Sequence, residues 1–173
     1  PVGEELYEKM RAKLQQFFHD KQMPEKLRRK ILEASVRAEE DWHYDAVQAA
    51  YDSGDQEWKL TAVFCMPYLP GFDEQILDCL DSQDPRIQYQ AVCAAGNWGL
   101  EEAWTRVCDL ANSEEIDKEL RLEAIAALGT IKPAESLSIL NELIDSEDQD
   151  IIDTAYEALG MAEGSLGFFT EED

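Results

Sequence analysis

The sequence predicts an all-α fold, an α-solenoid of about five helical-hairpin repeats with an N-terminal capping helix. Three observations predict it. Apolar residues recur at i, i+4, i+7 and i+8, the spacing that lines one face of an α-helix. The pattern returns about every thirty residues, and no strand-like alternation interrupts it. Residues 1–173 are therefore expected to form one repeat domain.

Four alanines anchor the repeat. Ala62, Ala91, Ala124 and Ala155 stand 29, 33 and 31 residues apart, and each is followed by another apolar residue. A second column consists of Asp-Ser or Asn-Ser turns, which lie between the end of one apolar stripe and the start of the next. Two columns that share one period indicate stacked units, which bury their stripes against their neighbours.

The first helix of each unit carries the stripe. In the unit around Ala91, Asp84 is expected to cap this helix and Pro85 to occupy its first position, where the missing N–H costs nothing. Gly96, Gly129 and Gly160 follow the stripes and are expected to end these helices in the left-handed conformation.

A second helix in each unit is expected to cover the first. Its apolar residues again fall at helical intervals. They are Phe72, Ile76, Leu77 and Leu80, then Ala103, Val107 and Leu110, then Leu137, Leu140, Leu143 and Ile144.

The two ends of the chain differ from the middle. The repeats are predicted to span 25–163, and their first, degenerate unit starts with a stripe of Leu27, Ile31 and Ala34. A helix at 3–20 is expected to cap the open end of the stack with its apolar face. That face consists of Leu6, Met10, Leu14 and Phe17. Residues 164–173 form an acidic tail, in which Phe168 and Phe169 are expected to fold back as a lid.

The charge of the chain excludes some partners. Asp and Glu number 38 against 15 Lys and Arg, which gives a net charge of −23. This charge repels nucleic acids and anionic lipids, so neither a nucleic acid nor a membrane is an expected partner. The sequence has no run of eighteen apolar residues and no signal-peptide core, so a cytoplasmic location is expected. The charge then serves either solubility or the binding of a basic protein.

The sequence has no arrangement of residues that is typical of an enzyme. Cys65, Cys79, Cys93 and Cys108 lie in apolar helical patterns without Cys-x-x-Cys, so they are expected to be small buried hydrophobes rather than zinc ligands or a redox pair. Catalytic motifs are missing as well, and the chain is predicted to be no enzyme and to hold no metal or cofactor. His43 stands among carboxylates that would raise its pKa and make it a proton carrier, but a surface histidine at a helix start is the preferred interpretation.

The second helices provide the candidate binding surface. Positions outside their apolar stripes are mostly carboxylates, which would form an acidic strip with Tyr44 and Trp104 as aromatic anchors. The predicted partner-binding residues are Tyr44, Asp45, Gln48, Asp73, Glu74, Asp78, Glu101, Glu102, Trp104, Asp109, Glu135 and Glu142. The alternative for Trp104 is the core between repeats, where Trp58 and Trp98 are expected.

The stretch SQDPRIQYQAVCAAGNWG, with its Asp-Pro turn, apolar-x-x-x-Ala stripe and closing glycine, resembles a HEAT-like repeat of the short bacterial kind, the phycobilisome-lyase type. The stretch DKELRLEAIAALGTIKPAESLSILNELIDSEDQDI resembles it more closely. The resemblance implies a scaffold that binds proteins along a groove lined by the second helices. Some members assist bilin attachment, and others are hydroxylases or DNA glycosylases. The repeated His-Glu pairs of the hydroxylases have no counterpart here, since His19 and His43 are followed by Asp20 and Tyr44. The glycosylases need a basic groove, which this acidic chain does not offer, and for the lyases only the repeat matches.

The predicted function is a non-catalytic protein–protein interaction scaffold that binds a basic partner along an acidic curved face. The scaffold is expected to be a monomer or a weak homodimer, with self-association through its terminal helices. The alternative is an accessory protein or lyase-type chaperone for the attachment of bilin or another cofactor.

Overall fold

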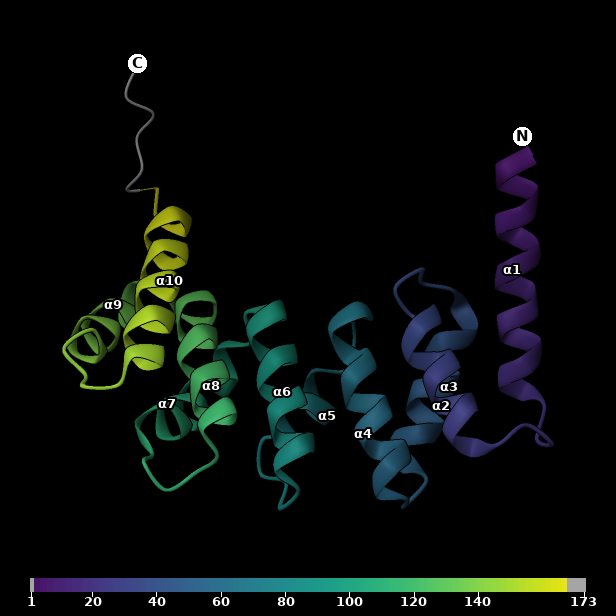
Figure 1. Ribbon diagram of the computed structural model, residues 1–173, viewed down its shortest axis with the longest axis horizontal. Coiled ribbons are helices and arrows are strands. Elements are labelled where there is room, and N and C mark those ends of the chain that lie inside the picture. The colour runs from purple at the N-terminus through teal and green to yellow at the C-terminus, as the bar shows by residue number, and fades with distance from the viewer. Residues whose placement is uncertain (1, 168–173) are drawn as a thin grey trace. The chain divides into compact units, whose positions relative to one another are not determined.

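The computed structural model describes residues 2–167 and confirms the all-α prediction, because every regular element in this range is a helix (Figure 1). Phe168 and Phe169, the predicted lid, lie outside the described residues. Within 2–167, no helix has the length and apolar character needed to cross a membrane. The helices are α1 (Val2–His19), α2 (Glu25–Ser35), α3 (Asp41–Asp52), α4 (Gln56–Cys65), η1 (Met66–Tyr68), α5 (Asp73–Cys79), α6 (Pro85–Trp98), η2 (Glu101–Ala103), α7 (Trp104–Asn112), α8 (Lys118–Ile131), α9 (Pro133–Leu143) and α10 (Gln149–Ser165).

Packing divides the chain into two compact units, unit 1 (Pro1–Phe72) and unit 2 (Asp73–Asp173). Helices α1 to α4 lie in unit 1 and α5 to α10 in unit 2. The predicted helical hairpins are present, but their pairing differs from the prediction. Each stripe helix packs more extensively against the helix that precedes it than against the one that follows, so the hairpins are α3–α4, α5–α6, α7–α8 and α9–α10, with α1–α2 before them.

A capped turn connects the two helices of each of the last four hairpins. An aspartate caps α4, α6, α8 and α10, and its carboxylate accepts the backbone N–H two residues on at 2.9–3.0 Å. In three of these turns a serine Oγ accepts the backbone N–H of the cap residue. The capping aspartates are Asp55, Asp84, Asp117 and Asp148. Of these four caps, only Asp84 was predicted from the sequence, and that prediction is confirmed.

The four anchor alanines occupy equivalent places. Ala62, Ala91, Ala124 and Ala155 each stand seven residues after the capping aspartate, and all four are fully buried. In unit 2 the stripe helices α6, α8 and α10 lie side by side (Figure 1), with α8 in the middle. Within unit 2 the predicted repeat columns are therefore a three-dimensional repeat, in which each stripe helix packs against the next.

The prediction for the three glycines was wrong. Gly96, Gly129 and Gly160 lie inside α6, α8 and α10, and α6 ends instead at Gly99, whose φ is +59°. Two of the three lie where successive stripe helices meet. A Cβ on Gly129 would come within 2.5 Å of the backbone oxygen of Ala158, and a Cβ on Gly96 within 3.1 Å of the Ala127 Cβ. These glycines therefore permit close helix approach rather than a helix stop.

The predicted apolar faces of the first two helices were also partly wrong. Leu6 and Met10 of α1 are 60% and 58% exposed, and Leu27 and Ala34 of α2 are exposed too. The buried residue near the end of α1 is Phe18. The buried apolar residues of α2 are Ile31 and Leu32, and Val36 directly after the helix is buried too. The N-terminal part of α1 therefore does not bury the stripe that was expected to cap the stack.

Candidate interaction surfaces

The predicted binding residues are divided between the two units. Tyr44, Asp45 and Gln48 lie on α3 in unit 1, and the other nine lie on α5, η2, α7 and α9 in unit 2. Within unit 2, the helices α5, α7 and α9 pack against the stripe helices and have no extensive contacts with one another among the described residues. The carboxylates of unit 2 are therefore carried by separate helices, and the acidic strip that they would form stays a prediction.

The predicted binding residues differ in their exposure and in the contacts that they already make within the protein. All eight predicted carboxylates of unit 2 are exposed, and Glu101 pairs with Lys132 at 3.5 Å. Trp104 is half-buried. The Tyr44 hydroxyl donates a hydrogen bond to Glu39, which raises the pKa of this phenol, and its ring stacks on Phe72 at 6.3 Å between centroids. The partly buried Tyr44 ring is thus already packed within unit 1.

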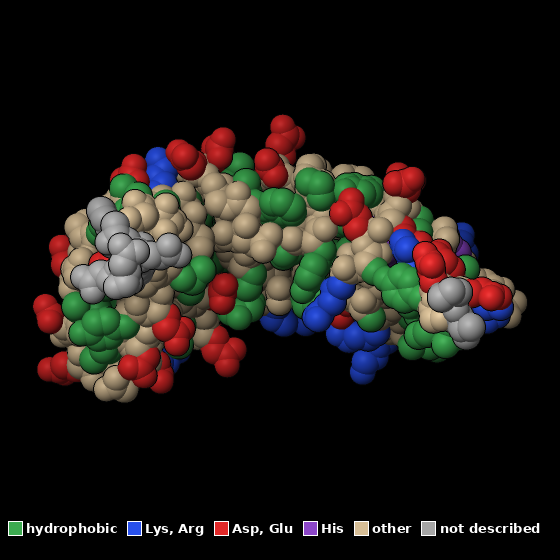
Figure 2. Space-filling view, turned by 90° about the horizontal axis from the view of Figure 1, so that it is seen from above, with side chains coloured by type: hydrophobic (Ala, Val, Ile, Leu, Met, Phe, Trp, Pro, Cys, Tyr) green, Lys and Arg blue, Asp and Glu red, His purple; other side chains and the backbone are tan. Residues whose placement is uncertain are grey.

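The two units differ strongly in charge. Unit 1 has ten Lys and Arg residues against 13 Asp and Glu, whereas unit 2 has five against 25. Unit 2 thus carries −20 of the net charge of −23. Figure 2 shows many Asp and Glu side chains projecting from the visible face of unit 2, with few Lys and Arg among them. The excess of negative charge is a property of unit 2.

The five cations of unit 2 all have partners within unit 2. Four form ion pairs: Arg86 with Asp84, Arg106 with Asp81, Lys118 with Asp148 and Asp150, and Lys132 with Glu101. The fifth, Arg121, donates its Nε–H to the Ala111 carbonyl at 3.0 Å. Because these cations neutralise only a small part of the 25 acidic groups, the surface of unit 2 keeps a strongly negative potential.

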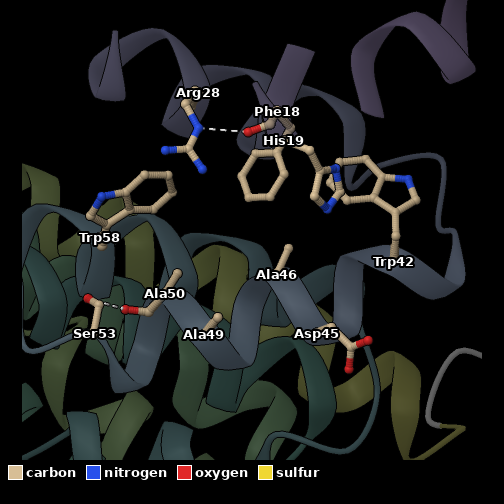
Figure 3. Close-up of a pocket in the computed structure, with 10 residues that line it drawn as sticks. All are labelled: Phe18, His19, Arg28, Trp42, Asp45, Ala46, Ala49, Ala50, Ser53 and Trp58. Carbon is tan, nitrogen blue, oxygen red and sulfur yellow. Dashed lines mark hydrogen bonds between the residues drawn. The ribbon is translucent and has the colours of Figure 1, made fainter. Parts of the chain in front are cut away.

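Unit 1 contains a cavity that the sequence did not predict (Figure 3). Its volume is about 420 Å³. It lies among the last turn of α1 and the helices α2, α3 and α4. The lining residues are Phe18, His19, Arg28, Trp42, Asp45, Ala46, Ala49, Ala50, Ser53 and Trp58. The sequence signal that could have found it is the grouping of aromatic residues around the degenerate first repeat, with Phe17 and Phe18 before it, Trp42 within it and Trp58 after it.

Aromatic rings form the walls of this cavity. The Phe18 ring lies 5.2 Å from the Trp42 ring and 6.2 Å from the Trp58 ring, measured between centroids. Trp58 was expected in the core, but it is half-buried and faces the cavity. Trp98 was also expected in the core and is 38% exposed, so that expectation was wrong. Trp58 lies in the first turn of α4, and Trp98 is the last residue of α6, so both lie near a helix end rather than in the buried middle of the stripe.

Arg28 is the fixed cation of the cavity. Its Nε–H donates to the Phe18 carbonyl at 2.7 Å, and its guanidinium carbon lies 5.5 Å from the Phe18 ring centroid and 5.4 Å from that of Trp58. No carboxylate within residues 2–167 forms an ion pair with Arg28. Figure 3 shows the guanidinium between the Trp58 and Phe18 rings, above α3. The cavity thus combines an apolar interior with one oriented positive group.

His43 is fully buried, so the expectation of a surface histidine was wrong. Its Nδ1 accepts the Glu40 backbone N–H at 2.9 Å, so the neutral ring carries its proton on Nε2 and donates it to Ser35 Oγ at 2.9 Å. Burial lowers the pKa of His43, because it disfavours the charged ring more than the nearby Glu40 favours it. A histidine that donates to the serine cannot take its proton, so this pair joins α2 to α3 and is not a catalytic dyad.

The cysteines differ in burial. Cys65 and Cys79 are fully buried as predicted, but Cys93 and Cys108 are half-buried. Burial raises the pKa of Cys93 to about 12, with a further contribution from the Glu123 carboxylate. A thiol of this kind is a poor nucleophile at neutral pH. The described part of the chain contains no group of three or more His, Cys, Asp or Glu residues placed to hold a metal ion.

Comparison with known proteins identifies the repeat. No curated protein matches the chain. A family model described as HEAT repeats matches residues 74–160, which is just over half of the sequence and covers α5 through most of α10. The match does not extend to the phycobilisome-lyase type, which remains a prediction. With its capped hairpins, buried alanine column and close-packed stripe helices, the chain belongs to the HEAT repeat family.

Proposed function

We propose that the protein is a non-catalytic binding module and that unit 2 recruits a basic segment of another protein through its exposed carboxylates. HEAT repeats commonly mediate protein–protein interactions. The observation that supports recruitment of a basic segment is the charge of unit 2. This unit has 25 acidic residues and five basic ones, and all five basic residues have partners within the unit.

Electrostatic complementarity would act mainly on the rate and the selectivity of association. A strongly negative surface attracts a Lys- or Arg-rich segment over about a Debye length, which is about 8 Å at physiological salt. It also repels acidic competitors. Binding of this kind depends on ionic strength, and this dependence gives the proposal its test.

The test compares two variants with the same net charge. In the first, Glu74, Glu102, Glu135 and Glu142 on the second helices are changed to Gln. In the control, Glu114, Glu115, Glu119 and Glu157, which are exposed elsewhere on unit 2, are changed to Gln. Proteins captured from a cell extract by the full chain and by each variant are identified by mass spectrometry at low and high NaCl.

The proposal predicts that the main captured protein has a basic segment and is released by high salt. It also predicts that the second-helix variant loses this protein while the control variant keeps it. If the captured protein stays bound at high salt, or is itself strongly acidic, the proposed electrostatic binding is contradicted. Equal loss from both variants would show that general charge, not the second-helix surface, is responsible.

A further inference from the structure

We propose that the aromatic cavity of unit 1 is a second binding site, which takes a peptide segment carrying a bulky apolar side chain next to a carboxylate. This site goes beyond the function proposed for unit 2. It lies in the other unit, it is largely apolar, and its fixed charge is positive rather than negative.

The interior of the cavity suits a large apolar side chain. Phe18, Trp42 and Trp58 form its walls, and three alanines of α3 form its floor (Figure 3). Because alanine has only a methyl group, an inserted side chain can lie directly against α3. The volume of about 420 Å³ falls within the range of roughly 300–1,000 Å³ that is typical of ligand sites. Burying an aromatic or aliphatic group here would remove apolar surface of both partners from water.

Arg28 supplies the charged contact. Its Nε is already bonded to the Phe18 carbonyl, and its guanidinium lies over two rings, so little side-chain entropy remains to be lost on binding. Arg29 adds a second positive charge beside Trp58, with its guanidinium carbon 5.9 Å from the ring centroid. A carboxylate that reaches Arg28 would gain charge-assisted hydrogen bonds. An acidic residue is therefore the expected neighbour of the apolar anchor.

Charges of opposite sign at the two ends of the cavity favour one direction for the bound segment. Asp45 lies toward the Trp42 end, whereas Arg28 lies beside Trp58 (Figure 3). Asp45 can accept hydrogen bonds from backbone N–H groups or a basic side chain but would repel a second carboxylate. The two charges thus favour one orientation, with the acidic residue of the segment toward Trp58.

The open rim favours a peptide over a small molecule. Asp45 and Ala49 of α3 and Ser53, the residue directly after this helix, line the cavity at intervals of about one helical turn, and all three are exposed. A chain can therefore run past the cavity along α3 while one side chain enters it. Tryptophan and arginine, which surround the entrance, are the residue types that most often dominate binding energy at protein interfaces.

The test uses short random peptides displayed on phage and selected on the full-length protein. Ala49→Trp fills the floor from an exposed position, and Ala134→Trp makes the same change at an exposed alanine of α9. Arg28→Gln removes the fixed charge, and Lys26→Gln removes an exposed charge of the same helix outside the cavity. The selected peptide is synthesised, its affinity for each variant is measured, and circular dichroism checks that each variant is folded.

The expected result is an enriched peptide with an aromatic or large aliphatic residue beside Asp or Glu. Ala49→Trp and Arg28→Gln should each weaken its binding by about tenfold or more, while both controls bind like the original protein. The proposal fails if no peptide is enriched, or if enriched peptides bind the Ala49→Trp variant unchanged. It also fails if 2-naphthoate binds in the cavity while peptides with the same chemistry do not.

Discussion

At the scale of single residues, His43 is held neutral at the junction of α2 and α3. The ring is fully buried, accepts the Glu40 N–H at Nδ1 and donates to Ser35 from Nε2. Protonation of Nδ1 would direct a new N–H against the Glu40 N–H, which now donates to this atom, and would also place a positive charge in the core. Both effects oppose ionisation of the folded protein, which explains the lowered pKa.

This arrangement predicts a stability that depends on pH. The folded protein resists protonation of His43 below the ordinary pKa of 6.5, while the unfolded chain takes up the proton. The contribution is thus fully present above pH 6.5 and is lost as the pH falls from 6.5 toward the lowered pKa of the folded protein. The slope should be at most about 1.4 kcal/mol per pH unit.

Urea unfolding at several pH values checks this prediction. His43→Gln should be less stable at neutral pH, because the buried hydrogen bonds change, but should lose less stability than the original protein on acidification. His19→Gln, which removes the exposed histidine, serves as the matched control for the substitution itself. An identical acid slope for His43→Gln would show that other groups cause the loss.

At the scale of helices, close approach of the stripe helices depends on glycine. Gly129 of α8 faces the backbone of Ala158 in α10, whereas Gly160, the equivalent residue of α10, faces open space. Both occupy the same repeat position. They differ only because α8 is followed by another stripe helix within the described chain and α10 is not.

Two alanine substitutions should therefore have opposite effects. In Gly129→Ala the new Cβ would lie 2.5 Å from the Ala158 carbonyl oxygen, so α8 and α10 must separate, at a cost of roughly 1–3 kcal/mol. Gly160→Ala meets no atom within 4 Å and should stabilise the protein by about 0.5–1 kcal/mol through helix propensity. Denaturant unfolding of both variants measures the difference. Equal effects would mean that the helices adjust without cost.

At the scale of the whole molecule, charge is distributed unevenly. Unit 2 carries a net charge of −20, and its own cations offset few of its carboxylates. Like charges at this density repel one another in the folded state, and they separate when the chain unfolds. The charge that supports solubility, and that the proposed recognition of a basic segment requires, therefore lowers the free energy of unfolding.

Salt should therefore stabilise the protein. Screening weakens the repulsion within unit 2, so raising NaCl from about 20 mM to about 300 mM should increase stability by about 1 kcal/mol and Tm by about 2–4 °C. Scanning calorimetry measures the shift. KCl at equal ionic strength should give the same result, because screening does not depend on the cation. A Tm that falls or stays constant would contradict the repulsion argument.

The sequence by itself determined the secondary structure and the repeat. The alanine column, the period near thirty residues and the aspartate turns are local patterns, and helical spacing and capping act over a few residues. This is why Ala62, Ala91, Ala124 and Ala155 were placed correctly. The exposed carboxylates of unit 2 also follow from local pattern, since they stand opposite an apolar stripe.

Only the tertiary structure decided which faces meet. Whether Gly129 ends a helix or contacts one depends on where α10 lies, and whether His43 is buried depends on the tertiary fold that brings it against Ser35 of α2. The aromatic cavity brings together residues from four helices, with Phe18 and Trp58 separated by forty positions in the sequence. Periodicity describes one helix face at a time, and a site formed by several faces depends on their packing in three dimensions.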